Sequence, residues 1–551
     1  MVTNMEEWWR RSAVYQIYPK SFNDTTGNGI GDLQGIIEKL DYLKGLGVDV
    51  IWLTPIYTSP QNDHGYDIAD YYSIHSDYGT MEDFEHLLSE THRRGMKLIM
   101  DLVVNHTSTA HAWFQDAQTS KDTRYRDFYI WKDTPNNWQS KFGGNAWEYN
   151  EASGDYYLHL FDVTQADLNW ENKELRNHVY EMMRFWFNKG IDGFRLDVIN
   201  LISKDQRFPN DDTGDGRKFY TDGPRVHEYL HEMNREVLSH YDSMTVGEMS
   251  STSIDHCIKY SNPDRQELSM TFNFHHLKVD YPDGEKWALA DFDFQSLKNI
   301  LSEWQIRMYE GGGWNALFWC NHDQPRIVSR FGDEYEFHNK SAKMLATTIH
   351  LMQGTPYIYQ GEEFGMTNPK FAAINQYRDV ESHNMYEQLL NDGLAEKTVM
   401  AILKEKSRDN ARTPVQWDDS PNAGFTTGTP WIDVNADYKE VNAEQAIEDH
   451  NSIFHHYKAL IQLRKDYDII TYGDYQLLAP EDEQIFAYRR TWKKDTLLVI
   501  NNFFDTETTF ACPVDLLEKN ASLLLTNDHH RQLQSTMKLA PYESLVFYVT
   551  E

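Results

Sequence analysis

Cysteine is scarce in this sequence: three residues, Cys257, Cys320 and Cys512, stand among 551. Their odd number and wide spacing exclude a disulfide framework and a cysteine-based zinc site. Apolar runs long enough to cross a bilayer are missing, and residues 1–9 lack the apolar centre of a signal peptide. We therefore expect a cytoplasmic protein that does not bind a membrane.

Basic residues are outnumbered: 52 Lys and Arg stand against 85 Asp and Glu, which gives a net charge of −33. A field of this sign argues against nucleic acid or an anionic membrane as a partner. It leaves a small-molecule substrate, and an anionic substrate would need a local cluster of basic side chains. We expect a monomer or a weak oligomer.

Strand-like and helix-like segments alternate over the first hundred residues, which is typical of a parallel α/β fold. Gly47 is the expected C-cap of the first helix. The rhythm breaks after residue 104 and returns near 171, and from 475 on short alternating segments predict an antiparallel β domain. The predicted strands are 13–18, 48–53, 97–104, 269–272 and 356–359, with others starting near 193, 244 and 316, and the predicted helices are 33–46, 81–94 and 173–189.

Three acids follow strand-like segments: Asp197, Glu248 and Asp323. Parallel strands of a closed barrel end on one face, so these carboxylates can meet at one point. Arg195 lies two residues before Asp197 and can keep that carboxylate ionised, although a buried ion pair without function would have the same pattern. A pair of flanking carboxylates supplies what glycoside cleavage needs, a nucleophile and an acid of raised pKa.

Four segments, residues 101–106, 193–197, 246–248 and 321–323, resemble the signature regions of the α-amylase superfamily of glycoside hydrolases. Residues 165–169 are similar to a fifth region of its oligo-1,6-glucosidase branch. The resemblance implies a (β/α)₈ barrel with a domain inserted after strand three and a C-terminal antiparallel β-sandwich. The expected domains are the barrel, 1–104 and 171–473, the insertion, 105–170, and the sandwich, 474–551.

The same resemblance implies a role for each acid. Asp197 would be the nucleophile, Glu248 the general acid and base, and Asp323 a stabiliser of the strained, oxocarbenium-like sugar. His106 and His322 would donate hydrogen bonds to sugar hydroxyls.

The inner end of the pocket is also implied by the resemblance. Tyr66 would stack under the first glucose, and Asp63, paired with Arg412, would close the pocket behind that ring. A closed end predicts removal of one glucose at a time. The alternative reading of this pair is a surface ion pair that contributes little.

Residues 269–281 and 218–225 resemble members of the branch that act on α,α-trehalose 6-phosphate. A phosphorylated disaccharide needs cations near the pocket rim. We expect Lys278 and Lys286 first, with Arg225 and His275 as further candidates. Each of them alone fits a solvated surface charge better, and the prediction rests on the group. The expected products are glucose and glucose 6-phosphate.

Three other functions stay open. Val198, directly after Asp197, is a residue that the branch associates with α-1,6 cleavage, so an oligo-1,6-glucosidase acting on isomaltose is the main alternative. An isomerising transglycosylase is a further one. A non-catalytic relative is disfavoured, because such proteins lack part of the carboxylate set and carry a membrane anchor.

The loop from Asp24 to Asp32 resembles a calcium loop of the branch and the first half of an EF-hand. We expect either a structural Ca²⁺ or Mg²⁺ there or an ordinary turn rich in Asp and Asn. No organic cofactor is implied. The candidate ligands are Asp24, Thr26, Asn28, Ile30 and Asp32.

Overall fold

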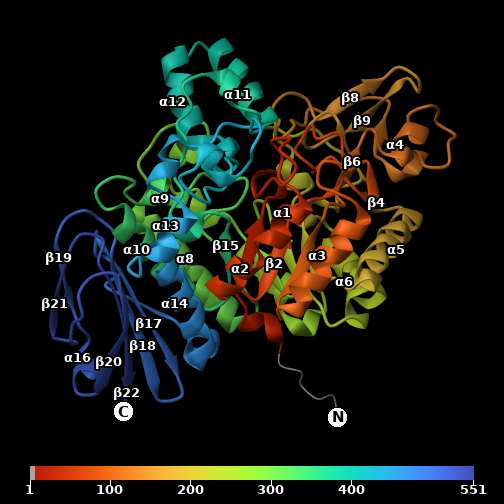
Figure 1. Ribbon diagram of the computed structural model, residues 1–551. Helices are drawn as coiled ribbons and strands as arrows, with labels where there is room; N and C mark the ends of the chain where they lie inside the picture. The colour runs from red at the N-terminus through yellow and green to blue at the C-terminus, as the bar shows by residue number, and fades with distance from the viewer. Residues whose placement is uncertain (1–6) are drawn as a thin grey trace.

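The computed structural model describes residues 7–551, and Figure 1 shows a central barrel, an excursion beside its upper rim and a C-terminal sheet domain. Residues 1–6, which belong to the predicted barrel segment 1–104 and to the stretch expected to lack a signal peptide, lie outside the described residues. The barrel strands are β1 (Val14–Ile17), β2 (Val50–Leu53), β5 (Lys97–Leu102), β11 (Gly193–Leu196), β12 (Met244–Glu248), β13 (Met270–Phe272), β14 (Ala316–Leu317) and β15 (Thr355–Tyr359).

All neighbouring barrel strands run parallel, in the order β13-β12-β11-β5-β2-β1-β15-β14. Thr271 of β13 also pairs in parallel with Asn315, next to β14, so the two ends of the sheet meet. The predicted (β/α)₈ barrel is confirmed. Its eight strands deliver their carboxyl ends to one rim, which is where catalytic side chains collect in this architecture.

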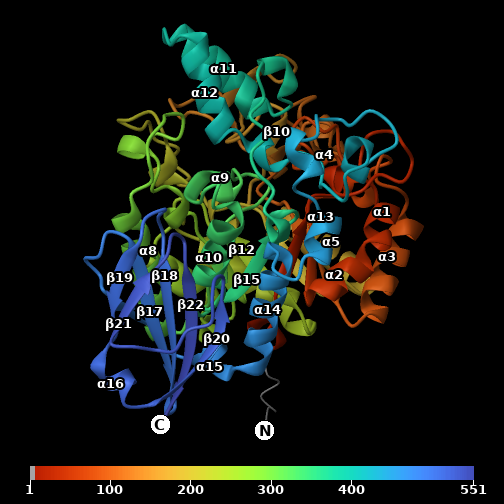
Figure 2. The ribbon, with the colours of Figure 1, turned by 60° about the vertical axis from the view of Figure 1, so that its left-hand side comes forward.

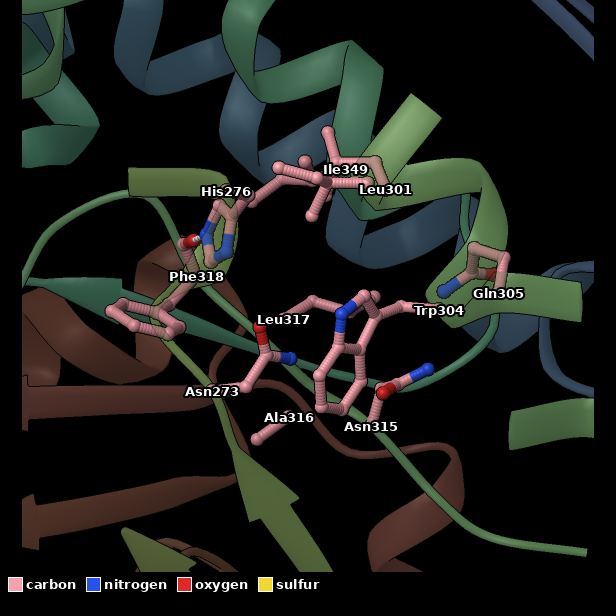
Figure 3. Close-up of a pocket in the computed structure, with 11 residues that line it drawn as sticks. Asn273, His276, Leu301, Trp304, Gln305, Asn315, Ala316, Leu317, Phe318 and Ile349 are labelled. Carbon is pink, nitrogen blue, oxygen red and sulfur yellow. Dashed lines mark hydrogen bonds between the residues drawn. The ribbon is translucent and has the colours of Figure 1, made fainter. Parts of the chain in front are cut away.

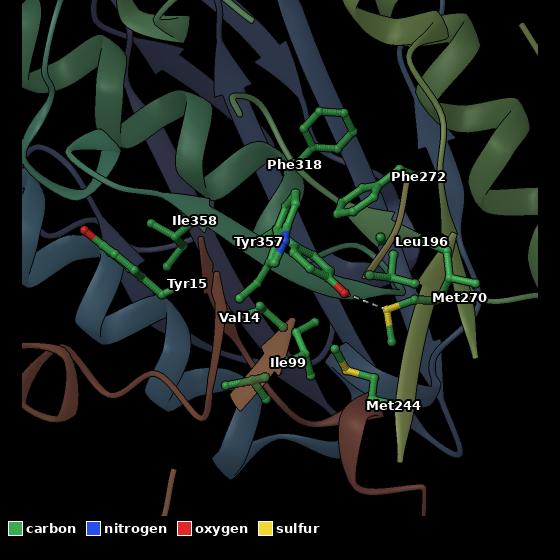
Figure 4. Close-up of a cluster of buried hydrophobic side chains, with 14 of the residues drawn as sticks. Val14, Tyr15, Ile99, Leu196, Met244, Met270, Phe272, Phe318, Tyr357 and Ile358 are labelled. Carbon is green, nitrogen blue, oxygen red and sulfur yellow. Dashed lines mark hydrogen bonds between the residues drawn. The ribbon is translucent and has the colours of Figure 1, made fainter. Parts of the chain in front are cut away.

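The interior of the barrel is filled by apolar side chains from successive strands (Figure 4). Val14, Ile99, Leu196 and Met244 are completely buried, and the Tyr357 hydroxyl contacts the sulfur of Met270. Because helices cover the outside, the strands are buried on both faces and read as near-continuous apolar runs. This core fixes the strand ends relative to one another.

Helices cover the barrel between successive strands. The helix predicted over 33–46 is interrupted at Lys39, whose backbone leaves the helical region, and it ends at Gly47 with a positive φ of 103°. Glycine suits this left-handed C-cap. The helices are α1 (Leu33–Glu38), α2 (Leu40–Leu46), α3 (Met81–Arg93), α5 (Lys173–Lys189), α6 (Val226–Glu236), α7 (Ile254–Ser261), α8 (Phe294–Glu310), α9 (Ile327–Phe331), α10 (His338–His350), α13 (Ala443–Glu448), α14 (Ile453–Asp466) and α15 (Asp468–Tyr472).

Two additions stand over the rim. The first is the excursion, built from small antiparallel sheets and one helix, and the second is a hairpin of α11 (Val380–Asn391) and α12 (Glu396–Lys406) (Figures 1 and 2). They meet where the Asn384 amide donates to the Phe142 carbonyl, at 3.1 Å. The excursion contains β6 (His106–Ser108), α4 (Ala112–Ala117), β7 (Trp131–Lys132), β8 (Trp147–Asn150), β9 (Asp155–Leu158) and β10 (Gln165–Asp167), and a separate pair, β3 (Tyr57–Thr58) and β4 (Asp70–Ile74), precedes it.

The C-terminal part is a five-stranded antiparallel sheet, in the order β16-β17-β18-β22-β20, with a two-stranded sheet packed against it. Phe510, Met537 and Leu539 of the small sheet share an apolar cluster with Leu498 and Phe547 of the large one, which confirms the predicted sandwich. The predicted boundaries at 105, 171 and 474 fall between elements. The strands are β16 (Gln476–Leu478), β17 (Ile485–Trp492), β18 (Asp495–Asn502), β19 (Thr508–Ala511), β20 (Asn520–Thr526), β21 (Thr536–Leu539) and β22 (Ser544–Thr550), with helix α16 (Val514–Leu517).

Candidate active site

Arg195 lies at the centre of the candidate site, inside the barrel rim and 1% exposed. One terminal nitrogen, Nη1, donates to Asp101 at 2.9 Å and to Asp197 at 2.6 Å, and Nη2 donates to Glu248 at 2.5 Å. A guanidinium offers rigidly placed donors and stays charged when buried. It therefore holds three carboxylates from neighbouring strands around one positive charge.

Strand register places Asp197 beside Glu248. In the β11–β12 ladder Leu196 is opposite Gly247, so the residues that follow each emerge together at the rim. Gly193 permits this close pairing, because a Cβ atom there would lie 1.8 Å from the Met244 carbonyl oxygen. The two carboxylates share one guanidinium, which suits the short separation of about 5–5.5 Å that retaining cleavage requires.

Val198, directly after Asp197, has an unusual backbone conformation. Its φ of 36° is in the left-handed region, which a β-branched residue rarely adopts. This conformation points the Val198 N–H at Glu248, where it donates at 3.1 Å. A short 3₁₀ turn, Ile199–Leu201, follows.

Burial sets the protonation of the acid pair. Burial raises the pKa of Asp197 to about 7 against the opposing charge of Arg195. Burial also raises the pKa of Glu248 to about 8, and the charges of Asp197 and Asp323 add to that rise. The arrangement therefore favours an ionised Asp197 beside a protonated Glu248 near neutral pH, which are the two states that glycosyl transfer to a carboxylate needs.

Asp323 has the opposite environment. Burial disfavours its charge, but His322, Arg408 and Arg412 outweigh that effect and hold the pKa of Asp323 below its usual range. Arg412 donates to Asp323 at 2.7 Å, and Gln16 donates to Nδ1 of His322 at 2.8 Å, which turns the other ring nitrogen toward Asp323 at 3.3 Å. Asp323 thus stays ionised over the whole neutral range.

The predicted partner of Asp63 is corrected by the structure. Asp63 pairs with Arg408, at 3.0 Å, whereas Arg412 is taken up by Asp323 and by the His322 carbonyl, at 2.8 Å. A short 3₁₀ helix, Arg408–Ala411, places the two arginines on different sides of the same acidic group. Two arginines four residues apart carry no local signal that would tell them apart.

Seven of the thirteen predicted catalytic and substrate-binding residues line a single cavity of about 230 Å³ at the rim. Tyr66 lies stacked on His322, with ring centroids 5.0 Å apart, and its hydroxyl donates to Asp101. Both ring nitrogens of His106 are engaged, by the Tyr66 carbonyl and by Asn105, so its bond to a sugar hydroxyl stays a prediction. The lining residues are Asp63, Tyr66, His106, Lys141, Phe142, Phe161, Asp197, Val198, Glu248, Lys286, Asp323, Gln324, Glu381 and Arg408.

Sequence reasoning missed several members of this lining. Phe142 and Phe161 come from the excursion, and Glu381 comes from the α11 hairpin. These elements reach the cavity through contacts far apart in sequence, such as Asn384 with Phe142. Aromatic residues are frequent throughout residues 105–170, and nothing in their spacing distinguishes those that face the cavity.

The four cations proposed for the phosphate separate in the structure. Lys286 lines the cavity but donates to both oxygens of Glu381, each at 2.9 Å, and Lys278 is exposed. The prediction that Arg225 binds the phosphate is corrected by the structure. Arg225 pairs with Glu171 and Glu228 at the start of α6 and does not line the cavity.

The prediction that His275 binds the phosphate is also corrected by the structure. Its ring packs against Trp304, 5.3 Å between centroids, and Trp304 borders a different, mostly apolar cavity between α8 and residues 315–318 (Figure 3). His276 points into the same cavity and contacts the Phe318 carbonyl at 2.8 Å. This histidine pair follows β13 but turns away from the acids.

The loop from Asp24 to Asp32 satisfies itself by hydrogen bonds. Asp24 accepts from the N–H groups of Thr26, Gly27 and Gly29 and from the Thr426 hydroxyl, while Asp32 accepts from Thr25 and caps α1. Within residues 7–551 no group of three His, Cys, Asp or Glu side chains is arranged to hold a metal ion. N–H and hydroxyl groups already donate to the carboxylate oxygens that a cation would need, so the loop in this arrangement does not fit Ca²⁺ or Mg²⁺.

A (β/α)₈ barrel that gathers two buried carboxylates and a third, ionised acid in one rim cavity defines a barrel glycoside hydrolase. Residues 16–473 match the catalytic domain of α-amylase, and residues 485–546 match the C-terminal domain of the α-amylase SusG. The chain belongs to the α-amylase family of glycoside hydrolases.

Similarity to individual proteins extends over the whole chain. It is 68% identical to trehalose-6-phosphate hydrolase of Bacillus subtilis, covering 100% of both chains, and 53% identical to oligo-1,6-glucosidase of Parageobacillus thermoglucosidasius, covering 98% and 99%. The crystal structure of Bacillus licheniformis trehalose-6-phosphate hydrolase is 66% identical, covers 99% of this chain and all of that chain, and superposes with a TM-score of 0.95. No helix of the described residues is long and apolar enough to cross a membrane.

The acid pair predicts a bell-shaped pH profile for an uncharged aryl α-glucoside. Activity should rise as Asp197 loses its proton near pH 7 and fall as Glu248 loses its proton near pH 8. The measurement is kcat/KM from about pH 5 to about pH 10, with folding monitored by circular dichroism at each pH. An alkaline limb in the ordinary range of a solvated glutamate would contradict the assignment.

The internal hydrogen bonds of the Asp24–Asp32 loop predict that divalent metal has no effect on the stability of the protein. Dialysis against EDTA, followed by addition of Ca²⁺ or Mg²⁺, should leave Tm unchanged, because both oxygens of Asp24 already have donors. The control is Asp24→Asn, which should lower Tm equally with and without metal. A Tm that rises with Ca²⁺ in the unsubstituted protein alone would restore the calcium loop.

Proposed function

We propose that this protein hydrolyses α,α-trehalose 6-phosphate to glucose and glucose 6-phosphate with retention of configuration. The observation that carries the proposal is an acid-lined cavity that also contains Lys141 and Lys286, in a chain whose net charge is −33. Full-length similarity to two trehalose-6-phosphate hydrolases supports it, at 68% and 58% identity. A phosphorylated substrate and three buried free thiols also support a reducing, cytoplasmic location.

Cleavage takes two displacements. Asp197 attacks the anomeric carbon while Glu248 gives its proton to the bridging oxygen, so the glycosidic bond breaks and a β-glucosyl ester forms. Glu248, now ionised, takes a proton from water, which attacks the ester carbon and releases Asp197 with overall retention. Asp323 binds the sugar hydroxyls and favours the strained ring of the transition state.

The inner end of the cavity accommodates one glucose. Asp63 and Arg408 line the cavity together with Tyr66, and Asp379 holds Arg408 at 2.5 Å, so the wall is fixed by a buried network. Such a network has a defined geometry because an unpaired charge at this depth would be costly. It supports release of a single glucose per event from the non-reducing end.

An oligo-1,6-glucosidase remains the second candidate. Val198 favours it by resemblance, and the relative at 53% identity covers 98% of the chain. Lys286 does not discriminate between the two functions, because Glu381 neutralises it. The two candidates differ in whether the leaving sugar carries a phosphate.

The assigned roles predict opposite products when azide replaces the missing carboxylate. With an activated aryl α-glucoside, Glu248→Ala should accumulate the ester, and azide should yield α-glucosyl azide. Asp197→Ala should instead yield the β-azide, because azide then attacks in the place of the nucleophile. Before azide is added, the activity of each variant should be about 10²–10⁴-fold lower than that of the unsubstituted enzyme.

The anomeric configuration of each azide is measured by NMR. Asp323→Ala serves as the matched control, since the loss of a hydroxyl-binding group is not repaired by a nucleophile on either face. The same anomer from both carboxylate variants would disprove the division of roles.

Substrate comparison tests the proposal itself. Charge-assisted bonds to the phosphate predict that kcat/KM for trehalose 6-phosphate exceeds that for trehalose and isomaltose by on the order of 100-fold. The three sugars are compared at equal concentration and salt, with glucose release as the readout. Isomaltose as the best substrate would leave a glucosidase and remove the phosphate from its function.

A further inference from the structure

The turns that follow β11 and β12 are joined by a buried side chain that the mechanism above does not use. We infer that Asn200 is a positioning residue for the two catalytic acids: its amide ties the turn after Asp197 to the turn after Glu248 and so sets how Glu248 meets the glycosidic oxygen. The inference rests on the roles given to Asp197 and Glu248 in the proposed function. It does not depend on which sugar is the natural substrate.

The strand pairing that aligns the two acids stops just before them. The last parallel pair between β11 and β12 is Leu196 with Gly247. Both chains then leave the extended conformation, with a φ of 36° at Val198 and of 49° at Ser251. Backbone bonds between these strands therefore do not hold the spacing of the carboxylates beyond this point, and another contact has to do so.

The side chain of Asn200 supplies that contact. It is completely buried and pairs twice with the backbone of Ser250: Oδ1 accepts from the Ser250 N–H at 3.0 Å, and Nδ2 donates to the Ser250 carbonyl at 2.7 Å. An amide that exchanges both bonds with a peptide group acts as a neighbouring strand would. Because Asn200 lies three residues after Asp197 and Ser250 lies two residues after Glu248, the pair extends the alignment past the end of the strands.

Asp222 fixes the orientation of this amide. It accepts from Nδ2 of Asn200 at 3.1 Å, and its own N–H donates to the Asn200 carbonyl at 2.9 Å. Asp222 is held in turn by the Tyr260 hydroxyl of α7, at 2.5 Å, and by the Thr252 hydroxyl, at 2.9 Å. Both donor directions and the oxygen of the amide are thus engaged, and a flipped amide would set its oxygen against a carboxylate.

The turn that Asn200 holds also orients Glu248. The Val198 N–H donates to Oε2 of Glu248 at 3.1 Å, and the same oxygen accepts from Arg195 at 2.5 Å. An oxygen that accepts two N–H bonds is not the one to carry a proton, so the proton for acid catalysis belongs on Oε1. Val198 lies between Asp197 and Asn200, and a shift of this turn by about 1 Å is enough to cost on the order of 10²-fold in rate.

The glucose-binding side of the cavity lies outside this network. Asp63 follows β2, Asp323 follows β14, and Arg408 pairs with both, at 3.0 and 3.4 Å. Removal of the Asn200 amide leaves these ion pairs in place. We therefore expect the change to act on proton transfer to the leaving group, and so on kcat more than on KM.

The test compares two aryl α-glucosides that differ in their need for a proton. Phenolate is a more basic leaving group than p-nitrophenolate, so phenyl α-glucoside depends more on a correctly placed Glu248. Asn200→Ala should lower kcat/KM about 100-fold for phenyl α-glucoside and about tenfold or less for p-nitrophenyl α-glucoside, with KM changed less than about threefold.

The pH profile gives a second readout. Burial raises the pKa of Glu248, and the bond from the Val198 N–H opposes that rise. Because Asn200→Ala loosens the turn that carries this N–H, the alkaline limb of kcat/KM for phenyl α-glucoside should move to higher pH. A residue that only stabilised the fold would lower both substrates alike and leave the limb in place.

Asn262→Ala is the matched control. Asn262 also bridges two backbone segments, since it accepts from the Asp264 N–H at 2.9 Å and donates to the Gly311 carbonyl at 2.9 Å. It lies between α7 and β13, at the end of the barrel opposite the rim. Asn262→Ala should lower Tm but leave the ratio of the two aryl glucosides within about twofold.

An exchange of side chains tests the contact itself. Asn200→Asp sets a second carboxylate against Asp222 and leaves the Ser250 carbonyl without its donor, so its rate should be at least as low as that of Asn200→Ala. Addition of Asp222→Asn returns a donor to the pair and should recover about threefold or more in a double-mutant cycle. These variants keep the size of the side chain and give the measurement if circular dichroism shows that Asn200→Ala does not fold.

The outcomes separate this inference from the proposed function. If azide gives the same anomer with Glu248→Ala and Asp197→Ala, the assigned roles fail and the inference fails with them. If the anomers differ but Asn200→Ala lowers both aryl glucosides equally, or lowers only Tm as Asn262→Ala does, the roles hold and the inference is overturned. A larger loss on phenyl α-glucoside together with the alkaline shift supports it.

Discussion

One buried guanidinium is the constraint on which the site depends. Arg195 meets Asp101, Asp197 and Glu248 while a single positive charge is available to balance them. Three ionised acids around one cation cannot all be stable at this depth, so a proton must remain in the group. The pKa order of Asp197 and Glu248 assigns that proton to Glu248. Acid catalysis at neutral pH then follows from charge balance.

The barrel makes this balance possible by holding the strand ends in register. The Asp101 carboxylate lies near the Trp52 indole, whose N–H donates to its Oδ2 atom at 3.1 Å. The Tyr66 hydroxyl donates to the same Oδ2 atom at 2.9 Å. The Trp52 and Tyr66 rings also lie close to the Arg195 guanidinium, at 5.1 and 5.7 Å from their centroids. The aromatic residues around the arginine thus lock both its position and the orientation of its first carboxylate.

Sequence alone predicted what depends on local pattern. Strand alternation and parallel topology put Asp197, Glu248 and Asp323 at one rim, and Gly47 and the helix at 173–189 were predicted correctly. It did not predict that Asp63 selects Arg408 over Arg412, because that choice depends on which arginine Asp323 already holds. The cavity residues of the excursion and the α11 hairpin were missed for the same reason, since tertiary packing alone brings them to the barrel.

The two ends of the cavity have different electrostatic tasks. At the closed end, acids and arginines are paired and their charges are fixed, so the glucose meets a constant environment. At the open end, the charge of Lys141 acts on Glu248 and stabilises its ionised form, which opposes the proton that the acid must carry. An anionic leaving sugar bound at this end would offset that field. The bound substrate would then favour protonated Glu248 at the moment the first displacement needs it, which ties recognition of the phosphate to the chemistry of the bond that breaks.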